Sequence, residues 1–150
     1  MEKTMRDTKQ HIWILFSHVS KLIRDHANNE LNKYDLHLGQ SRIMNALRRQ
    51  GTLNQVDLAK GLHIKPATVT NMVQKLEKKG FITRIQSKND NRSLRISLTA
   101  KGHKAAKHIQ DVWNRIESEV QAVIPEDENE KVHFLLKKMR DSFGGKGPEI

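Results

Sequence analysis

The sequence predicts a mainly α-helical fold of the α+β class, in which long helices at both ends flank shorter helices and one β-hairpin. Three observations support this prediction. Apolar residues recur at three- and four-residue spacing through both terminal thirds, as on one face of a helix. Shorter stretches of the same period in the middle are punctuated by Gly51, Pro66 and Gly80. After Gly80, two stretches alternate apolar and polar residues around an Asn-rich turn, which is typical of a hairpin.

The first expected helix spans residues 8–33 and is long for a chain of 150 residues. A second is expected over residues 40–50, because Gly51 is a suitable C-terminal stop. The inward positions of these two helices are Ile12, Leu15, Phe16, Val19, Leu22, Ile23, His26, Ala27, Ile43, Met44 and Leu47.

Two short helices are expected next. Asn54 can cap the first through its side-chain oxygen. Pro66 suits the first position of the second, over residues 66–79, because proline has no N–H to lose there. The inward residues of that helix are Val69, Met72, Val73 and Leu76. Two such helices joined by three or four residues make a helix-turn-helix, and a hairpin directly after them makes it a winged one.

The strands of the hairpin are expected at residues 81–86 and 93–98, with Leu94, Ile96 and Leu98 on one face of the second. Thr99 then caps a long helix to about Ile124, and Pro125 ends it. A last helix is expected to open with the acidic run at 126–128 and to end at Gly144. The apolar stripes of these two helices are Ile109, Val112, Trp113, Ile116, Val120 and Val123, then Val132, Leu135, Leu136, Met139 and Phe143.

The organisation that follows is a single domain over residues 1–150. We expect the winged lobe at 38–99 and the long helices at 1–37 and 100–145.

The positive charge of the chain is concentrated in its middle third. Residues 60–107 hold 12 Lys and Arg against two Asp and Glu, whereas the ratio is nine to six before them and six to nine after them. A basic block of this kind is the electrostatic footprint of a surface that binds a polyanion. The alternative is a solvated basic face that maintains solubility.

The outward face of the helix at 66–79 has the chemistry of a major-groove reader. Asn and Gln can pair with adenine, Thr and Ala methyls can contact the thymine methyl, and Lys binds phosphate or guanine. The candidates are Ala67, Thr68, Thr70, Asn71, Gln74, Lys75 and Lys78, joined by Lys88, Asp90, Arg92 and Arg95 of the hairpin. In isolation Asn71 and Gln74 would be ordinary solvated residues, and it is their place after a helix-turn-helix that favours base contact. An arginine on a hairpin tip suits the narrow minor groove of A·T-rich DNA, with a phosphate contact or solvent exposure as the alternatives.

Three stretches carry a resemblance to a known family. They are LNQVDLAKGL, ATVTNMVQKLEKKGFITR and the spacing Asp90-x-Arg92-x5-Leu98-Thr99-x2-Gly102. Through them, residues 53–102 resemble the MarR family of winged-helix transcription regulators, and the last motif is the specific one. One long helix before this run and two after it also fit, so the resemblance covers essentially the whole chain.

The resemblance implies a homodimer in which the terminal helices of two chains interlock. Two winged lobes would then meet half-sites about 10 base pairs apart in a palindromic DNA operator. Arg92 would enter the minor groove, and Asp90 would orient it through an ion pair. Family members are commonly repressors that respond to small phenolic or lipophilic acids, to oxidation or to metal.

Two residues depart from the family pattern. His63 stands in the inter-helix turn where a glycine is common, and Lys65 stands where Ser or Thr usually caps the next helix. The missing hydroxyl costs on the order of 1 kcal/mol of helix stability. We expect Lys65 to contact a DNA phosphate, although it opposes the positive end of the helix dipole in the free protein.

The sequence constrains the effector only weakly. There is no cysteine, which excludes thiol oxidation as the signal. His26 and Glu30 have the i, i+4 spacing of two zinc ligands, but no further ligands are evident and His103 and His108 are five apart, so we expect no metal and no cofactor, with His26 a core histidine. The candidates for binding a small anion are Trp13, Phe16, His18, Arg24 and Trp113, with the two tryptophans as dimer core the alternative.

Other classes of protein are disfavoured. The sequence has no Gly-rich phosphate loop, no GxSxG and no HExxH, so we expect no catalytic residues and no enzyme. No apolar stretch is long enough for a membrane helix or a signal peptide, so we expect a cytoplasmic protein without a membrane partner. The sequence thus predicts a dimeric, sequence-specific DNA-binding regulator. The alternatives are an architectural protein that coats DNA with little sequence preference and a metal-responsive regulator of the same fold.

Overall fold

The computed structural model describes residues 11–86 and 94–145 of the chain. These residues form six α-helices and one antiparallel two-stranded sheet, so the predicted mainly α-helical class is confirmed. The elements are α1 (Ile12–Asn32), α2 (Leu38–Gln50), α3 (Gln55–Leu62), α4 (Pro66–Lys78), β1 (Ile82–Gln86), β2 (Leu94–Leu98), α5 (Ala100–Gln121), the short 3-10 helix η2 (Glu126–Glu128) and α6 (Asn129–Ser142).

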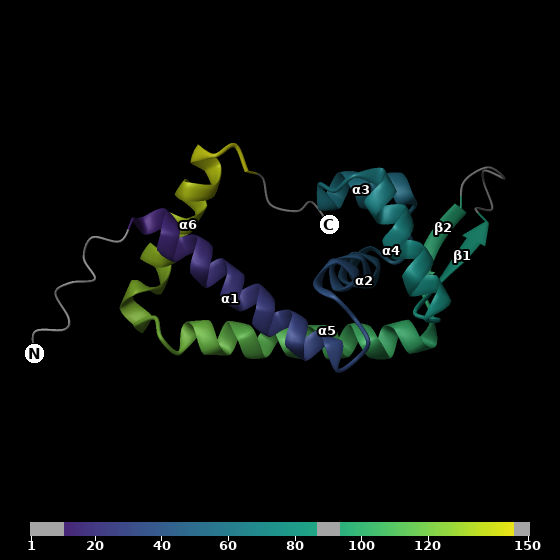
Figure 1. Cartoon of the computed structure of the whole chain (residues 1–150), viewed down its shortest axis with the longest axis horizontal. Helices are drawn as coiled ribbons and strands as arrows, with labels where there is room; N and C mark the ends of the chain where they lie inside the picture. Colours follow the sequence, from purple (N-terminus) through teal and green to yellow (C-terminus); the bar gives the residue numbers. More distant parts are fainter. Residues whose placement is uncertain (1–10, 87–93, 146–150) are drawn as a thin grey trace, which may run out of the picture.

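The elements separate into two ends joined by α5 (Figure 1). At one end, α2, α3, α4 and the two strands form the winged lobe. At the other end, α1 and α6 stand over the C-terminal part of α5. The helix α5 therefore runs along both ends of the molecule, beneath the lobe and beneath α1 and α6.

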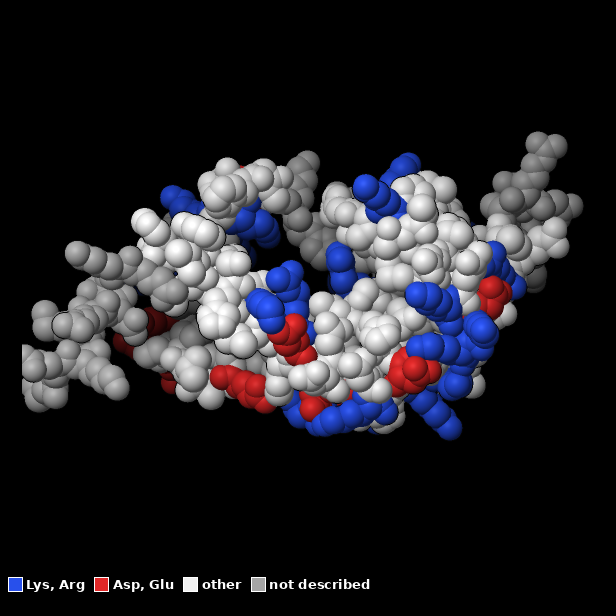
Figure 2. All heavy atoms as spheres, in the orientation of Figure 1, with Lys and Arg blue, Asp and Glu red and all other residues white. Residues whose placement is uncertain are grey.

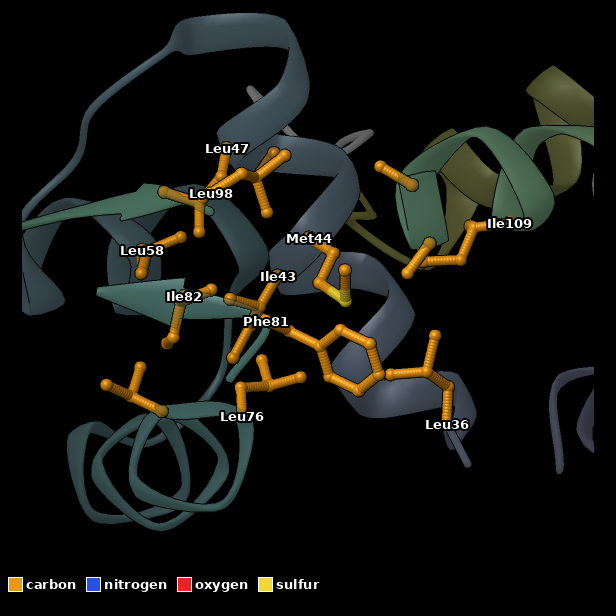
Figure 3. Close-up of a cluster of buried hydrophobic side chains, with 14 of the residues drawn as sticks. Leu36, Ile43, Met44, Leu47, Leu58, Leu76, Phe81, Ile82, Leu98 and Ile109 are labelled. Carbon is orange, nitrogen blue, oxygen red and sulfur yellow. The ribbon is translucent and has the colours of Figure 1, made fainter. Parts of the chain in front are cut away.

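The core lies around α2, which contacts α1, α3, α4, α5 and β2. Figure 3 shows side chains from α3, α4, α5 and β2 converging on Ile43 and Met44, both of which are fully buried. Leu36, Leu58, Leu76 and Ile109 reach the same cluster from the α1–α2 connection, α3, α4 and α5.

Helix ends follow the local signals in the sequence. Asn54 Oδ1 accepts a hydrogen bond of 2.7 Å from the Asp57 N–H, and Thr99 Oγ1 accepts one of 3.0 Å from the Gly102 N–H. Pro66 is the first residue of α4, and Gly51 ends α2 with a φ of 82°. These predicted caps and stops are confirmed, because each depends on neighbours in the chain rather than on tertiary contacts.

Several predicted boundaries shift. The α2 helix begins at Leu38 rather than at residue 40, because Asn28 Oδ1 accepts a hydrogen bond from the Leu38 N–H. The acidic run at 126–128 does not open the last helix, since it forms η2 and α6 begins at Asn129. The α5 helix ends at Gln121, three residues before the predicted Ile124.

The sheet pairs Ile82 with Leu98 at its base and Gln86 with Leu94 at its outer end. Leu53 joins β2 as an isolated bridge, in which Leu53 and Ile96 exchange N–H to carbonyl hydrogen bonds of 3.1 and 2.7 Å. Ile96 and Leu98 are buried as predicted, but Leu94 is 51% exposed. Leu94 shares the face of Ile96 and Leu98, as predicted, but it lies at the outer end of the strand, beyond the cover of the helices.

The stripe predicted for α1 is apolar but largely exposed. Only Ala27 and Leu31 of this helix are buried, and α6 has no buried residue in the described chain. The large exposed apolar side chains at this end of the molecule are Ile12, Trp13, Leu15, Phe16, Val19, Leu22, Val123, Phe134, Leu135, Leu136 and Phe143. Within the described residues, no helix is both long and apolar enough to cross a membrane.

Candidate nucleic-acid interface

The turn of the helix-turn-helix consists of residues 63–65, between α3 and α4. His63 adopts the left-handed conformation with a φ of 52°, and its N–H reaches the carbonyl oxygens of Ala59 and Lys60. Glycine adopts this conformation without strain, whereas for another residue it costs on the order of 1 kcal/mol. The imidazole of His63 is exposed beside the start of α4.

One face of the α4 helix packs against the lobe, and the opposite face is exposed to solvent. Val69, Val73 and Leu76 are fully buried against the lobe. The predicted outward residues Ala67, Thr68, Asn71, Gln74, Lys75 and Lys78 all lie outside this buried face. The structure therefore brings a set of amide, hydroxyl and ammonium side chains together on one rigid surface, which is the arrangement that major-groove readout requires.

Thr70 differs from the other outward residues. Its side chain is half-buried, and its hydroxyl lies 2.9 Å from Gln55 Oε1 and 3.1 Å from the Pro66 carbonyl oxygen. Gln55 is the first residue of α3, so this contact fixes the start of one helix against the first turn of the other. No pattern in the sequence indicates this pair, because it depends on how the two helices cross.

Lys65 occupies the N-cap position of α4, and its side chain makes no capping hydrogen bond. Its carbonyl accepts hydrogen bonds of 3.0 and 3.1 Å from the N–H groups of Thr68 and Val69. The exposed ammonium therefore has no capping role at a helix N-terminus, where the helix dipole favours an anion.

Arg95 is the candidate of the hairpin that the structure describes. Its side chain is exposed, and Nη2 donates a hydrogen bond of 2.9 Å to the Thr52 carbonyl oxygen. Part of its hydrogen-bonding capacity is thus used to hold β2 against the loop before α3. Lys88, Asp90 and Arg92 lie outside the described residues, so the ion pair between Asp90 and Arg92 stays a prediction.

A further ion pair joins α4 to the hairpin. Arg84 Nε of β1 lies 3.0 Å from Glu77 Oε2 of α4. Arg84 was not predicted as a site residue, although its position two residues after the buried Ile82 places it on the inner face of the strand. The sequence did contain a signal for this ion pair, namely a charged residue at a position of the strand where alternation predicts an inward-facing side chain.

Basic side chains also connect the lobe to its surroundings. Lys79 Nζ donates hydrogen bonds to Asp35 O at 2.6 Å and Oδ1 at 2.9 Å, and Lys101 Nζ donates one of 2.7 Å to Lys79 O. Figure 2 shows Lys and Arg side chains gathered over the lobe and the adjoining end of α5, and red acidic side chains more frequent toward the other end of α5. On the face shown, the charge asymmetry of the sequence is therefore visible at the surface.

The five candidates for effector binding are not brought together. A hollow of about 600 Å³ lies between α1, α5 and α6, and Phe16 and Arg24 are among its lining residues. Trp13, His18 and Trp113 are not among them: Trp13 is 68% exposed, His18 is exposed, and Trp113 packs against the core. Arg24 and Ser20 are the polar side chains of this otherwise apolar wall.

His26 and Glu30 pair with different partners. Glu30 contacts Lys33 Nζ at 2.6 Å and Arg115 Nη2 at 3.0 Å, and the hydrogen bond from Lys33 is the main reason that the pKa of Glu30 is lowered. His26 Nε2 lies 3.5 Å from Glu119 Oε2. Predicting His26 as a core histidine was wrong, because its side chain faces the polar side of α5 and is about half exposed.

No group of three or more potential metal ligands occurs among the residues of the two described ranges. The two other histidines considered, His103 and His108, are exposed on α5, and His108 stacks on Tyr34 with ring centroids 4.5 Å apart.

Comparison with known proteins gives a consistent result. The family model described as "MarR family" matches residues 36–94. The regulator PecS of Dickeya dadantii is 30% identical over 121 residues, which cover 79% of this chain and 72% of that protein. SarZ of Staphylococcus saprophyticus is 27% identical over 126 residues, covering 84% and 86%. A match to the HTH-type regulator YfiV of Bacillus subtilis, 28% identical over 103 residues, spans 69% of this chain and 64% of that protein.

Solved structures show the same fold. The chain superimposes on MepR of S. aureus, in a complex with DNA, with a TM-score of 0.81 at 29% identity, covering 89% of this chain and 99% of that one. It superimposes on a mutant of MarR from E. coli, complexed with operator DNA, with a TM-score of 0.75 at 23% identity, covering 85% and 92%.

Proposed function

The chain belongs to the MarR family of winged helix-turn-helix transcription regulators, and from this premise we propose that it is a homodimer that binds a palindromic DNA operator. The observation that carries the proposal is the α4 helix, whose buried face is fixed while its polar and basic face is exposed. No catalytic role is proposed for any residue. We place the protein in the cytoplasm, where its DNA would be.

The DNA contacts divide into two kinds. Ala67, Thr68, Asn71 and Gln74 would contact base edges in the major groove, with Thr70 adding its methyl group. Lys65, Lys75 and Arg95 would contact phosphates, which fix position without reading sequence. Lys88 and Arg92 of the hairpin would reach the adjoining backbone and minor groove, with Asp90 orienting Arg92.

The exposed apolar face of the terminal helices supports the homodimer. Ile12, Trp13 and Phe143 are 75%, 68% and 88% exposed in the single chain. An apolar surface that extends over two helices is expected to be covered by a partner. A second copy, related by two-fold symmetry, would bury the face of both chains and present two α4 helices to one duplex.

We also propose that the regulator is a repressor released from DNA by a small phenolic or lipophilic acid. The hollow between α1, α5 and α6 offers apolar walls, with Arg24 as a cation for a carboxylate or phenolate. Its walls include Ile12 and Phe16 of the exposed apolar face, so the acid would bind at the edge of the proposed dimer interface. Phe16 and Arg24 are the sequence candidates that this site would use. Trp13, His18 and Trp113 would then belong to the dimer face or to the surface.

The test is selection of duplexes from a random-sequence library, followed by affinity measurements at several salt concentrations. A regulator is expected to bind the selected palindrome roughly 10³-fold more tightly than unrelated DNA. An architectural protein would bind both duplexes with nearly equal affinity and with a steep salt dependence, because phosphate contacts carry no sequence information. That outcome would contradict the proposal.

A further inference from the structure

Glu77 is an acidic residue in the most basic region of the chain. Residues 60–107 contain two acids, Glu77 and Asp90, and Glu77 is the one that the structure describes. It lies near the C-terminal end of α4, between Lys75 and Lys78. A carboxylate on a helix that approaches DNA would repel phosphates, so any role of Glu77 in binding would depend on a contact within the protein.

That contact is Arg84 on the neighbouring strand. Arg84 lies on the same face of β1 as the buried Ile82, and its side chain is 27% exposed. Its Nε atom is buried, and the Glu77 carboxylate 3.0 Å away is the partner that the described chain supplies, as an ion pair rather than a well-aligned hydrogen bond. A buried cationic atom is costly without an opposite charge beside it.

The hairpin is attached at its other edge as well. Leu53 and Ile96 exchange two backbone hydrogen bonds, and Arg95 donates to the Thr52 carbonyl. In the register of the sheet, Arg84 pairs with Ile96. One rung of the hairpin is therefore held to α4 by the Glu77 ion pair on one side and to residues 52–53 on the other.

We propose that Glu77 is a positioning residue for DNA recognition, which fixes the angle between the hairpin and the recognition helix through Arg84. This inference rests on the proposed function. The last described pair, Gln86 with Leu94, lies two residues beyond Arg84, or about 7 Å at roughly 3.3 Å per residue. A small rotation of the hairpin about Arg84 displaces residues farther along the strands by a larger distance. With the pair intact, helix and hairpin meet the duplex as one rigid unit.

The experiment compares Glu77→Gln with Asp57→Asn, using the duplex selected by the wild-type protein and an unrelated duplex of equal length. Both substitutions remove one negative charge from the same lobe, and Asp57 is an exposed residue of the first turn of α3. If Glu77 were only a solvated acid, both variants would bind both duplexes slightly more tightly, because a repulsion is removed.

If Glu77 positions the hairpin, its substitution should weaken binding to the selected duplex instead of tightening it. Glu77→Gln should weaken binding to the selected duplex about tenfold, which corresponds to a coupling of about 1.4 kcal/mol, and should leave or tighten binding to the unrelated duplex. Asp57→Asn should not reduce the ratio of the two affinities. A loss of stability alone would lower both affinities together, so the ratio separates the two explanations.

A charge swap provides the rescue. Glu77→Arg combined with Arg84→Glu restores an ion pair and is expected to recover part of the affinity ratio that either single substitution loses. If Glu77→Gln unfolds at a lower temperature than the wild type, the double variant separates positioning from stability. A double variant that recovers none of the affinity ratio overturns the inference. Equal affinities of Glu77→Gln and Asp57→Asn for both duplexes also overturn it. A wild-type protein that does not distinguish the duplexes refutes the proposed function instead, and the inference with it.

Discussion

Gly102 packs directly against the backbone of Phe81. A Cβ atom on Gly102 would lie 1.9 Å from the Phe81 carbonyl oxygen and 3.2 Å from Leu98 Cδ2. The same carbonyl accepts the hydrogen bond of 3.0 Å from the Thr99 N–H. The start of α5 is therefore fixed to the residue just before the hairpin, which explains in physical terms why a glycine completes the Leu98-Thr99-x2-Gly102 motif.

Replacing Gly102 with alanine should destabilise the protein by about 1–3 kcal/mol, because the added methyl group must displace backbone atoms that cannot rotate away. The measurement is the free energy of unfolding in urea. Gly39→Ala is the matched control, since Gly39 also lies in the first turn of a helix. Its added Cβ would meet Met72 Sδ at 2.8 Å, the flexible end of a side chain. The control should change stability by less than about 1 kcal/mol, and an equal loss in both variants would contradict the explanation.

Thr70→Val should reduce stability by about 0.5–1.5 kcal/mol, because it removes the hydroxyl that joins Gln55 to the first turn of α4. Asn71→Ala should leave stability unchanged and weaken operator binding by about 1–3 kcal/mol, because its side chain is exposed and is proposed to contact a base. Thermal unfolding and DNA affinity are to be measured on both variants. If Thr70→Val reduced operator affinity without loss of stability, the Thr70 hydroxyl would contact DNA rather than hold α3 against α4.

Sequence reasoning predicted those features that depend on residues close together in the chain. The caps at Asn54 and Thr99 and the stop at Gly51 needed only their neighbours along the helix. The inward face of α4 followed from its period. The resemblance added the family, which the periodicity could not supply.

Features that depend on tertiary packing were not predicted. The pair of Glu77 with Arg84 and the contact of Gln55 with Thr70 join different elements, so their recognition requires the crossing angle of those elements. His26 was assigned to the core from the stripe of α1, but it lies beside Glu119 at the edge of the contact with α5, and the stripe does not reveal where that edge falls. The residues proposed to bind the effector were likewise chosen without knowledge of how the helices pack, and only Phe16 and Arg24 of the five line the hollow.

Acid should weaken the attachment of α1 to α5 through Glu30. Lys33 and Arg115 lower the pKa of Glu30 below its usual value. A carboxylate with a lowered pKa in the folded state contributes stability above its unfolded pKa, and this contribution is lost as the pH falls through the folded value. The gap in unfolding midpoint between wild type and Glu30→Gln should be present at neutral pH and close as the pH falls below the ordinary pKa of a glutamate and then through the lowered pKa of the folded state. A gap of constant size across that range would show that the charge of Glu30 is not responsible.

Arg92→Ala should weaken binding to the proposed operator by about 1–3 kcal/mol and leave the proposed homodimer intact. The reason is that the resemblance places Arg92 in the minor groove, where its loss removes a sequence-dependent contact. Lys65→Ala is the comparison, because loss of a phosphate contact is expected to weaken binding to all duplexes alike and to reduce the salt slope by about one. Affinities for operators with A·T or G·C pairs at the flanking positions distinguish the minor-groove contact of Arg92 from the phosphate contact of Lys65. An Arg92→Ala variant with unchanged affinity would refute the assignment of the hairpin.

A chain truncated after Ile124 should fail to form the proposed homodimer. The truncation removes α6 and leaves the apolar residues of α1 without their proposed cover, so monomers or aggregates are expected. Light scattering after size-exclusion chromatography measures the mass of the species directly. The control is truncation after Gly145, which keeps all of α6 and should preserve the dimer. A truncated chain that remains a well-behaved dimer after loss of α6 would locate the interface elsewhere, and the exposed face of α1 would then need a different partner.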